Sequence, residues 1–228
     1  MTTESVNLER VATLHRRIRW IVAATIGYNV VEAIVAITAG TIASSGALIA
    51  FGLDSTIEVL SAAAVAWQFT RRDPHRWERP TLRVIAVAFF ALAAYVITTS
   101  AVSLLARVEV EHSPLGIAIT ALSVIIMPFL SYAERRAGRE LGSATAVADS
   151  KQTLICTYLS AAVLIGLVLN SLFGWWWADA LAGLVIAVFA IREGIEAWRG
   201  DACATSVGML IEDGDAHEHD HDHDHDHD

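Results

Sequence analysis

The sequence has few charged residues and few cysteines. Only 18% of its 228 residues are charged, whereas 54% are hydrophobic, and the mean hydropathy is +0.48. Because a soluble domain needs more charge on its surface, this composition favours a membrane protein. The two cysteines, Cys156 and Cys203, are too few for a disulfide framework. Basic residues do not gather on one face, so we expect no nucleic-acid partner.

The net charge of -9 comes from the C-terminal end of the chain. Nine of the 25 acidic residues lie in the last 18 positions, which leaves 16 acidic residues to balance the 16 Lys and Arg residues. From residue 217 to 228 the sequence alternates His with an acidic residue. Such a segment has no apolar surface to bury, so we expect residues 200–228 to form a disordered, His- and Asp-rich cytoplasmic tail.

Long apolar runs recur six times along the rest of the chain. A helix needs about 20 mostly apolar residues to cross about 30 Å of hydrocarbon. The runs also lack the alternation that is typical of a barrel strand. We therefore predict an all-α integral membrane protein, in the cell membrane, with a cytoplasmic N-terminal segment at 1–17 and a transport domain at 18–199. The six transmembrane helices are expected at about residues 18–40, 43–68, 82–105, 116–133, 146–170 and 176–198.

The arginines predict how the chain is oriented. They gather before the first span, between the second and third, between the fourth and fifth, and at the end of the sixth, while the other three loops hold only Arg107. By the positive-inside rule, both the N and the C terminus are then cytoplasmic. No small-residue cleavage site follows a short apolar core near the N-terminus, so we expect no cleavable signal peptide.

Two features mark the predicted outer end of the sixth span. The run Trp175, Trp176 and Trp177 suits a membrane interface, where amphipathic rings anchor a helix; packing in the core is the alternative. Asp179 comes at the start of the same helix and is expected to cap backbone N–H groups.

The second span carries two carboxylates where hydrocarbon is expected. Asp54 and Glu58 are four residues apart, which stacks them on one face of a helix. Ionised groups at this depth are costly and are functional candidates by default. A bound cation would balance the pair. The alternative is a protonated, hydrogen-bonded pair with no ion.

The fifth span carries a second polar stripe, made of Asp149, Gln152 and Cys156. A thiolate is a soft ligand that suits zinc, and an amide oxygen is a weaker one. A buried cysteine can also be a small packing residue. Asp149 either receives ions at the cytoplasmic mouth or pairs with Lys151.

Depth along the helices adds a third span to the predicted site. At about 1.5 Å per residue, Glu32 of the first span lies level with Asp54, whereas Gln152 is nearer the cytoplasm. A third carboxylate is a better zinc ligand than an amide, so we favour Glu32 over Gln152 as the fourth ligand. The alternative is a protonated Glu32 that hydrogen-bonds to a neighbouring helix.

Three runs of the sequence resemble the cation diffusion facilitator family. They are SGALIAFGLDSTIEVLS at 45–61, ADSKQTLIC at 148–156 and GWWWADALAG at 174–183. The second is similar to the family's Ala-Asp-x-x-His-x-x-x-Asp, and the third to its Gly-Trp-x-x-Ala-Asp-Pro-x-x-Gly. The resemblance covers roughly residues 18–198 and implies a homodimer that exports zinc, cadmium or iron in exchange for protons.

The sequence departs from the family pattern at two places. Gln152 and Cys156 stand where the family has His and Asp, so its metal preference does not carry over unchanged. About 30 residues follow the last span, which is too few for the family's folded cytoplasmic domain, so a short member is expected.

These observations together predict a secondary transporter that exports a divalent transition metal by metal/proton antiport. Zinc is the expected ion, with cadmium, iron and manganese as alternatives, and no permanently bound cofactor is expected. The protein is not expected to be an enzyme, because no nucleophile and base pair is evident; a membrane metal-binding or sensor protein is the other hypothesis. Six tail histidines are predicted to collect metal in the cytoplasm: His217, His219, His221, His223, His225 and His227.

Overall fold

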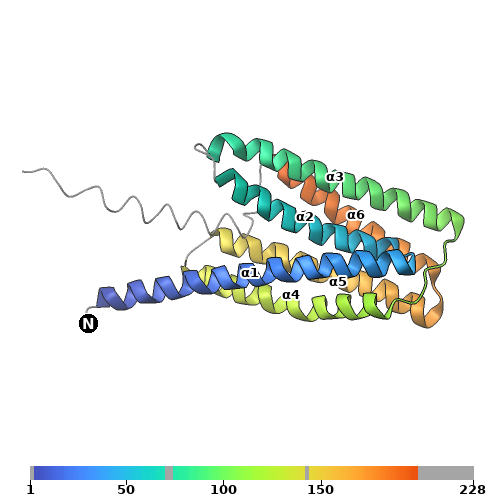
Figure 1. Ribbon diagram of the computed structural model, residues 1–228, viewed down its shortest axis with the longest axis horizontal. Helices are drawn as coiled ribbons and strands as arrows, with labels where there is room; N and C mark the ends of the chain where they lie inside the picture. Colours follow the sequence, from blue (N-terminus) through green and yellow to red (C-terminus); the bar gives the residue numbers. More distant parts are fainter. Residues whose placement is uncertain (1–2, 70–73, 142–143, 200–228) are drawn as a thin grey trace, which may run out of the picture.

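Helices account for nearly all of the described chain. The computed structural model describes the backbone of residues 3–69, 74–141 and 144–199, and it contains no strand in these ranges. The helices, shown in Figure 1, are α1 Thr3–Ala43, α2 Gly46–Phe69, α3 Pro74–Ala106, α4 Pro114–Leu141, α5 Ala144–Phe173 and α6 Trp176–Arg199. The predicted all-α fold is confirmed.

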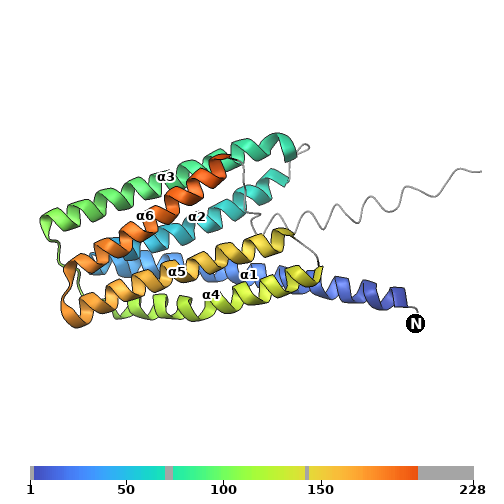
Figure 2. The same ribbon diagram turned by 180° about the vertical axis from the view of Figure 1, so that it is seen from behind.

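The six helices lie side by side in one bundle, as the two opposite views in Figures 1 and 2 show. Helix α2 packs against α1, α3, α5 and α6, while α4 packs against α1 and α5. The α3 and α6 helices form another extensive pair. Since α2 contacts helices on several sides, its polar residues face other helices rather than the surroundings of the bundle.

Five helices are long and apolar enough to cross a membrane, and their outer surfaces are apolar as well. Large side chains such as Leu105, Phe129 and Leu172 are 71–87% exposed, which suits contact with lipid rather than water. Helix α6 has the length, with 24 residues, but Arg192 and Glu193 interrupt its apolar stretch. The protein is therefore a multi-pass membrane protein. The five apolar stretches are Trp20–Ala43, Gly46–Ala64, Arg79–Ala106, Pro114–Ala137 and Thr153–Phe173.

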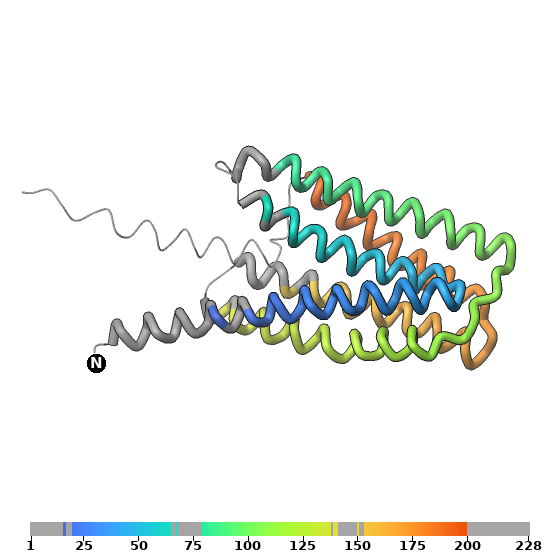
Figure 3. The backbone as a smooth tube through the Cα atoms, viewed as in Figure 1, coloured from blue at the N-terminus to red at the C-terminus, as the bar shows by residue number. Residues whose placement is uncertain are grey.

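The turns α1–α2, α3–α4 and α5–α6 lie together at one end of the bundle, which Figure 3 shows along the backbone. At this end α1, α3 and α5 are each followed by a residue in the left-handed region: Ser44 (φ 56°), Arg107 (φ 51°) and Gly174 (φ 64°). A left-handed residue after the last turn is a common way to stop a helix. The α1–α2 and α5–α6 connections are thus short and hold packed helices antiparallel, whereas residues 107–113 cross the end of the bundle between α3 and α4, which do not pack extensively against each other.

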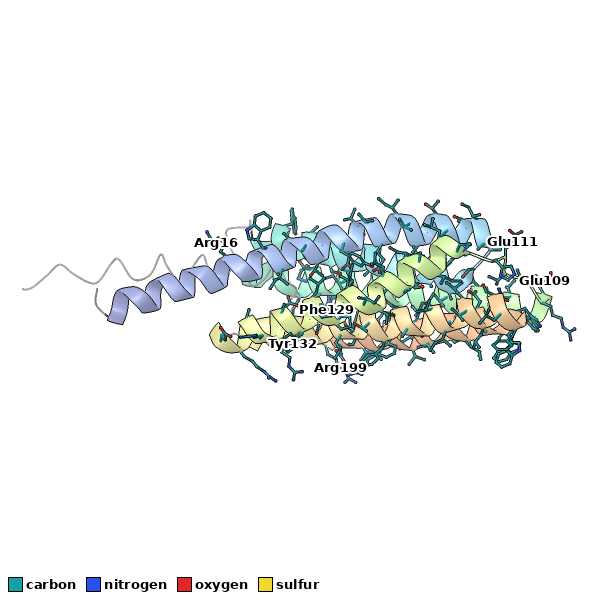
Figure 4. The ribbon with its side chains drawn as sticks, turned by 90° about the horizontal axis from the view of Figure 1, so that it is seen from below. Arg16, Glu109, Glu111, Phe129, Tyr132 and Arg199 are labelled. Carbon is teal, nitrogen blue, oxygen red and sulfur yellow. The ribbon has the colours of Figure 1, made fainter. Side chains whose placement is uncertain are left out.

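Charged side chains differ between the two ends of the bundle. Figure 4 shows Arg16 and Arg199 toward one end, and Glu109 and Glu111 at the end where α3 is followed by α4. This distribution agrees with the arginine pattern of the sequence. Which end faces the cytoplasm stays a prediction.

Asp179 caps a helix, but a different one from the helix in which it lies. It is only 3% exposed, and it accepts hydrogen bonds from Ser45 Oγ and, at 3.2 Å, from the backbone N–H of Ala47. Both partners belong to the start of α2, so the carboxylate ties α6 to α2. Nearby, the rings of Trp175 and Trp177 stack with centroids 5.0 Å apart and stay 41% and 37% exposed, which suits the predicted interface position.

Helices α1 and α2 approach each other through two glycines. A Cβ added at Gly52 would lie 2.9 Å from the backbone N of Ile37, and one at Gly40 would lie 2.8 Å from the backbone N of Ile49. Small residues allow such close packing inside a membrane. Gly52 precedes Asp54 by two residues, so this contact brings the polar residues of α1 close to those of α2.

Each of the six predicted spans coincides with a helix, in the predicted order, but three of the helices extend well past them. Helix α1 begins at Thr3 rather than near residue 18, α3 begins at Pro74 rather than near 82, and α4 continues to Leu141 rather than ending near 133. A helix satisfies its own backbone hydrogen bonds, so it need not stop where the hydrocarbon stops. The division into segments at 1–17 and 18–199 is therefore not a break in the helix.

Candidate metal centre

Three predicted ligands meet in the interior of the bundle. Asp54 and Glu58 lie one turn apart on α2, and Cys156 comes from α5. One ligand atom from each side chain lies within 4.8 Å of the other two. Asp54 and Cys156 are buried, and Glu58 is partly buried. The sequence therefore identified residues that the fold brings together from two helices.

Glu58 is the centre of this group. Its Oε1 accepts a hydrogen bond from the Cys156 thiol at an Sγ to O distance of 2.6 Å. Its Oε2 accepts another from Asn29 Nδ2 at 2.7 Å. Helices α1, α2 and α5 therefore converge on one carboxylate. A metal ion at this position would replace the thiol proton, because metal ligands bind in their deprotonated form.

Asn29 is a residue that the sequence reasoning missed. It lies in the first span, its side chain is only 5% exposed, and its Oδ1 is buried with no hydrogen-bond partner among the described residues. In the first span only the carboxylate of Glu32 was predicted as a ligand, and the amide three residues before it was not considered. Any strongly polar side chain at this depth is costly, and that rule could have found Asn29.

Glu32 lies close to the group of three but outside it. It is 1% exposed; its Oε2 accepts a hydrogen bond from Ser55 Oγ at 2.8 Å, and its Oε1 accepts one from Ser123 Oγ. The Tyr28 hydroxyl lies 2.6 Å from Ser123 Oγ. Glu32 therefore joins α1 to α2 and α4 through hydrogen bonds. Hydrogen bonding to a neighbouring helix is the alternative that the sequence left open for Glu32. Its carboxylate also lies within electrostatic range of Asp54.

A further carboxylate, Glu193 of α6, lies within electrostatic range of Asp54, as Glu32 does. It was not among the predicted site residues. Its position in the sequence, between Arg192 and a glycine near the end of the last span, resembles a helix end rather than a site. Only the packing of α6 against α2 reveals it.

The remaining predicted ligands lie outside what the structure describes. Asp149 and Gln152 belong to α5, but their side chains are not among those described, and neither are the tail histidines from His217 to His227. Their roles stay predictions.

The chemistry of the group suits a divalent transition metal. Two carboxylates and one thiolate carry three negative charges when deprotonated, which a divalent cation largely balances. Zinc accepts all three kinds of atom, at about 2.3 Å for sulfur and about 2.0–2.2 Å for oxygen. The thiolate favours softer ions such as cadmium, while the carboxylates also suit manganese. The group therefore mixes soft and hard ligand atoms of the kinds that bind divalent transition metals.

Comparison with known proteins agrees with this chemistry. Residues 22–199 match the family of the cation efflux transmembrane domain, which takes in the bundle apart from the start of α1. The chain is 32% identical over 87 residues to the cation-efflux pump FieF of Shewanella oneidensis, covering 38% of this chain and 29% of the pump. It is 24% identical over 192 residues to an uncharacterized transporter of Methanocaldococcus jannaschii, covering 80% and 66%.

A third relative is transmembrane protein 163 of Xenopus laevis, 23% identical over 184 residues, which are 78% of this chain and 64% of the relative. The chain thus spans between 29% and 66% of the length of these relatives. The family match nevertheless covers most of the chain and includes Asp54, Glu58 and Cys156. The chain belongs to the cation efflux, or cation diffusion facilitator, family of multi-pass membrane proteins.

Proposed function

We propose that the protein is a secondary transporter that exports a divalent transition metal, with zinc as the preferred ion, in exchange for protons. The observation that carries this proposal is the convergence of Asp54, Glu58 and Cys156, with ligand atoms within 4.8 Å of one another. Burying such a group inside a membrane costs free energy, so a group that is present there is a functional site by default. Family membership supports the same conclusion.

The depth of the group supports transport rather than binding at a surface. Asp54 and Glu58 lie eight and twelve residues after Gly46, the first residue of α2. At about 1.5 Å per residue, this places them about 12 and 18 Å along the helix, near the middle of about 30 Å of hydrocarbon. An ion held at the midplane is reached from either side by rocking of the helices, as in other secondary transporters.

Proton coupling follows from the ligands themselves. Because the Cys156 thiol donates to Glu58, zinc binding must displace at least that proton. Protonation of the thiolate and carboxylates from the opposite side lowers the affinity and favours release. Zinc affinity is therefore expected to fall as the pH falls, and each zinc transported one way is accompanied by protons moving the other way.

The arginine-rich end is proposed to face the cytoplasm, so that zinc leaves through the end that carries Glu109 and Glu111. In the same proposal, residues 200–228 form a cytoplasmic tail that collects metal, and the transporter works as a homodimer in the cell membrane. The proposal includes no permanently bound cofactor and no catalysed reaction.

The test is metal flux into vesicles that contain the purified protein and a fluorescent metal indicator. Zinc, cadmium, manganese and iron are added outside at neutral pH, with the interior either acidic or neutral. We expect zinc uptake that is saturable and faster with an acidic interior, and no uptake above protein-free vesicles for Asp54→Asn. Saturable binding without flux in the wild type would instead favour a metal sensor.

A further inference from the structure

We propose that Asn29 of α1 is a further ligand of the transported ion, which it binds through the amide oxygen Oδ1. This inference rests on the proposed function, because it completes the ion site of the transporter. It takes the fourth ligand from the first span, as the sequence prediction did, but assigns it to Asn29 rather than to Glu32, and it names a residue that sets which ion is preferred.

The first observation is an unused acceptor. Asn29 is 5% exposed, and the structure gives its Oδ1 no hydrogen-bond partner among the described residues, although the Nδ2 of the same amide is well bonded. Buried polar atoms without partners are rare in native proteins, and a missing ion is one of the common reasons for them. No other buried side-chain nitrogen or oxygen in the described part of the chain lacks a partner.

The second observation is the position of the amide. Nδ2 lies 2.7 Å from Glu58 Oε2, on the carboxylate whose other oxygen contacts the Cys156 thiol. Within one amide the oxygen and nitrogen are about 2.2 Å apart, so Oδ1 lies no more than about 5 Å from Glu58 Oε2. Ligand oxygens around one zinc ion lie about 3.4 Å apart, given zinc to oxygen bonds of about 2.1 Å. The terminal torsion of asparagine is soft, and rotation about it brings Oδ1 into this range while it exchanges the Nδ2 hydrogen bond to Glu58 for a bond from Oδ1 to the ion.

The third observation concerns the other candidates. Zinc usually takes four ligands, and the described ligand group supplies three. Both oxygens of Glu32 already accept serine hydroxyls, so moving this carboxylate onto the ion would disturb two buried hydrogen bonds that join α1 to α2 and α4. Asn29 would give up one hydrogen bond, from Nδ2, and gain a partner for an atom that has none among the described residues. Of these two residues, Asn29 is therefore the fourth ligand that changes the surrounding structure less.

A neutral fourth ligand has a consequence for ion preference. It adds an oxygen without adding charge, so the balance between the soft Cys156 thiolate and the hard carboxylates stays intermediate. Replacing Asn29 with aspartate adds a hard, charged ligand and should move the preference from cadmium toward manganese. Because α1 then touches the ion directly, ion binding also draws α1 toward α2 and α5.

The experiment measures binding of zinc, cadmium and manganese to the full chain in lipid nanodiscs by competition with a chelating dye. The variants are Asn29→Leu, Asn29→Asp and Asp54→Asn. The matched control is Asn170→Leu. Asn170 is also buried, but it lies near the C-terminal end of α5, where its amide donates a hydrogen bond to the Val110 carbonyl.

We expect Asn29→Leu to weaken zinc binding about 10–100-fold, the loss typical of removing a group that supports a metal site. Asn29→Asp should keep zinc affinity within about threefold and raise the manganese to cadmium affinity ratio at least about tenfold. Asn170→Leu should match the wild type. If Asn29→Leu does not give a monodisperse protein, Asn29→Ser, which also lacks the amide oxygen, takes its place.

The aspartate variant separates a ligand from a residue that only positions Glu58. If Asn29 acts solely by donating Nδ2, aspartate removes the donor and sets a like charge beside Glu58, so zinc binding falls at least as far as in Asn29→Leu. That result, or unchanged binding in Asn29→Leu, overturns the inference while Asp54→Asn still abolishes the tight binding and leaves only the weak binding of the tail histidines, which every variant shares. Absence of saturable zinc binding in the wild type overturns the proposed function as well.

Discussion

Replacement of Glu58 by glutamine is the substitution with the most predictable effect on the ion site. Glu58 accepts hydrogen bonds from Cys156 and Asn29 and lies within 4.8 Å of Asp54 through its ligand atom. Glutamine has the same shape but no charge. Its NH₂ group would also face the site where an oxygen is needed.

The size of the effect follows from the binding energy of zinc. Protein sites with four ligands bind zinc with about 10–16 kcal/mol, so the share of one charged ligand is about 3–4 kcal/mol. At about 1.4 kcal/mol for each factor of ten, Glu58→Gln should weaken zinc binding about 10²–10³-fold. The change should appear in the dissociation constant rather than in the stability of the helices, since the side-chain volume is preserved.

The assay is zinc titration of the purified protein in nanodiscs, by competition with a chelating dye. Glu109→Gln is the matched control, because Glu109 is exposed and lies at the end of the bundle, away from the group. It should bind zinc as the wild type does. A dissociation constant for Glu58→Gln within about threefold of the wild type, far below the expected share of one ligand, would refute the assignment.

Four further outcomes are expected. Cys156→Asp should weaken cadmium transport more than zinc or manganese transport in the vesicle assay, because a soft donor becomes a hard one; equal effects on all ions would make Cys156 a packing residue. Removal of the chain from His217 onward should leave transport active but lower uptake at scarce metal, whereas complete loss of flux would give the tail a mechanistic role. Glu32→Gln should weaken zinc binding less than Asn29→Leu does, and the opposite order in the same titration would restore Glu32 as the fourth ligand. Asp179→Ala should lower the free energy of unfolding by about 2–4 kcal/mol in detergent, since two buried donors at the start of α2 lose their acceptor; a change below about 0.5 kcal/mol would show that the cap contributes little.

Most of the fold is encoded in features that can be read one helix at a time. A span needs about 20 apolar residues, and in lipid a continuous apolar run satisfies its backbone hydrogen bonds by forming a helix. The number and order of the helices were therefore predictable. The starts of α1 and α3 and the end of α4 were not, because a helix that leaves the membrane can continue in water or at the interface. Asp179 is a similar case. The tendency of an aspartate to cap a helix can be predicted from the sequence, but the fact that it caps α2 depends on how α6 packs against α2.

The candidate site was predictable where it follows from spacing within a helix. Asp54 and Glu58 are four residues apart, which fixes both on one face, and the polar stripe of the fifth span supplied Cys156 in the same way. The direction in which Glu32 points depends on the rotation of α1 against α2 and α4, which depth alone does not give. Asn29 reaches the group only because α1 packs backbone to backbone on α2 near Gly52.

Zinc X-ray absorption spectroscopy asks most directly whether zinc binds at the buried group. The protein is loaded with one equivalent of zinc after removal of residues 217–228, so that the tail histidines do not contribute to the spectrum. We expect one sulfur at about 2.3 Å and oxygen ligands at about 2.0–2.2 Å, with the sulfur lost in Cys156→Ser. A wild-type spectrum without sulfur, or a sulfur signal that persists in Cys156→Ser, would contradict binding at Asp54, Glu58 and Cys156.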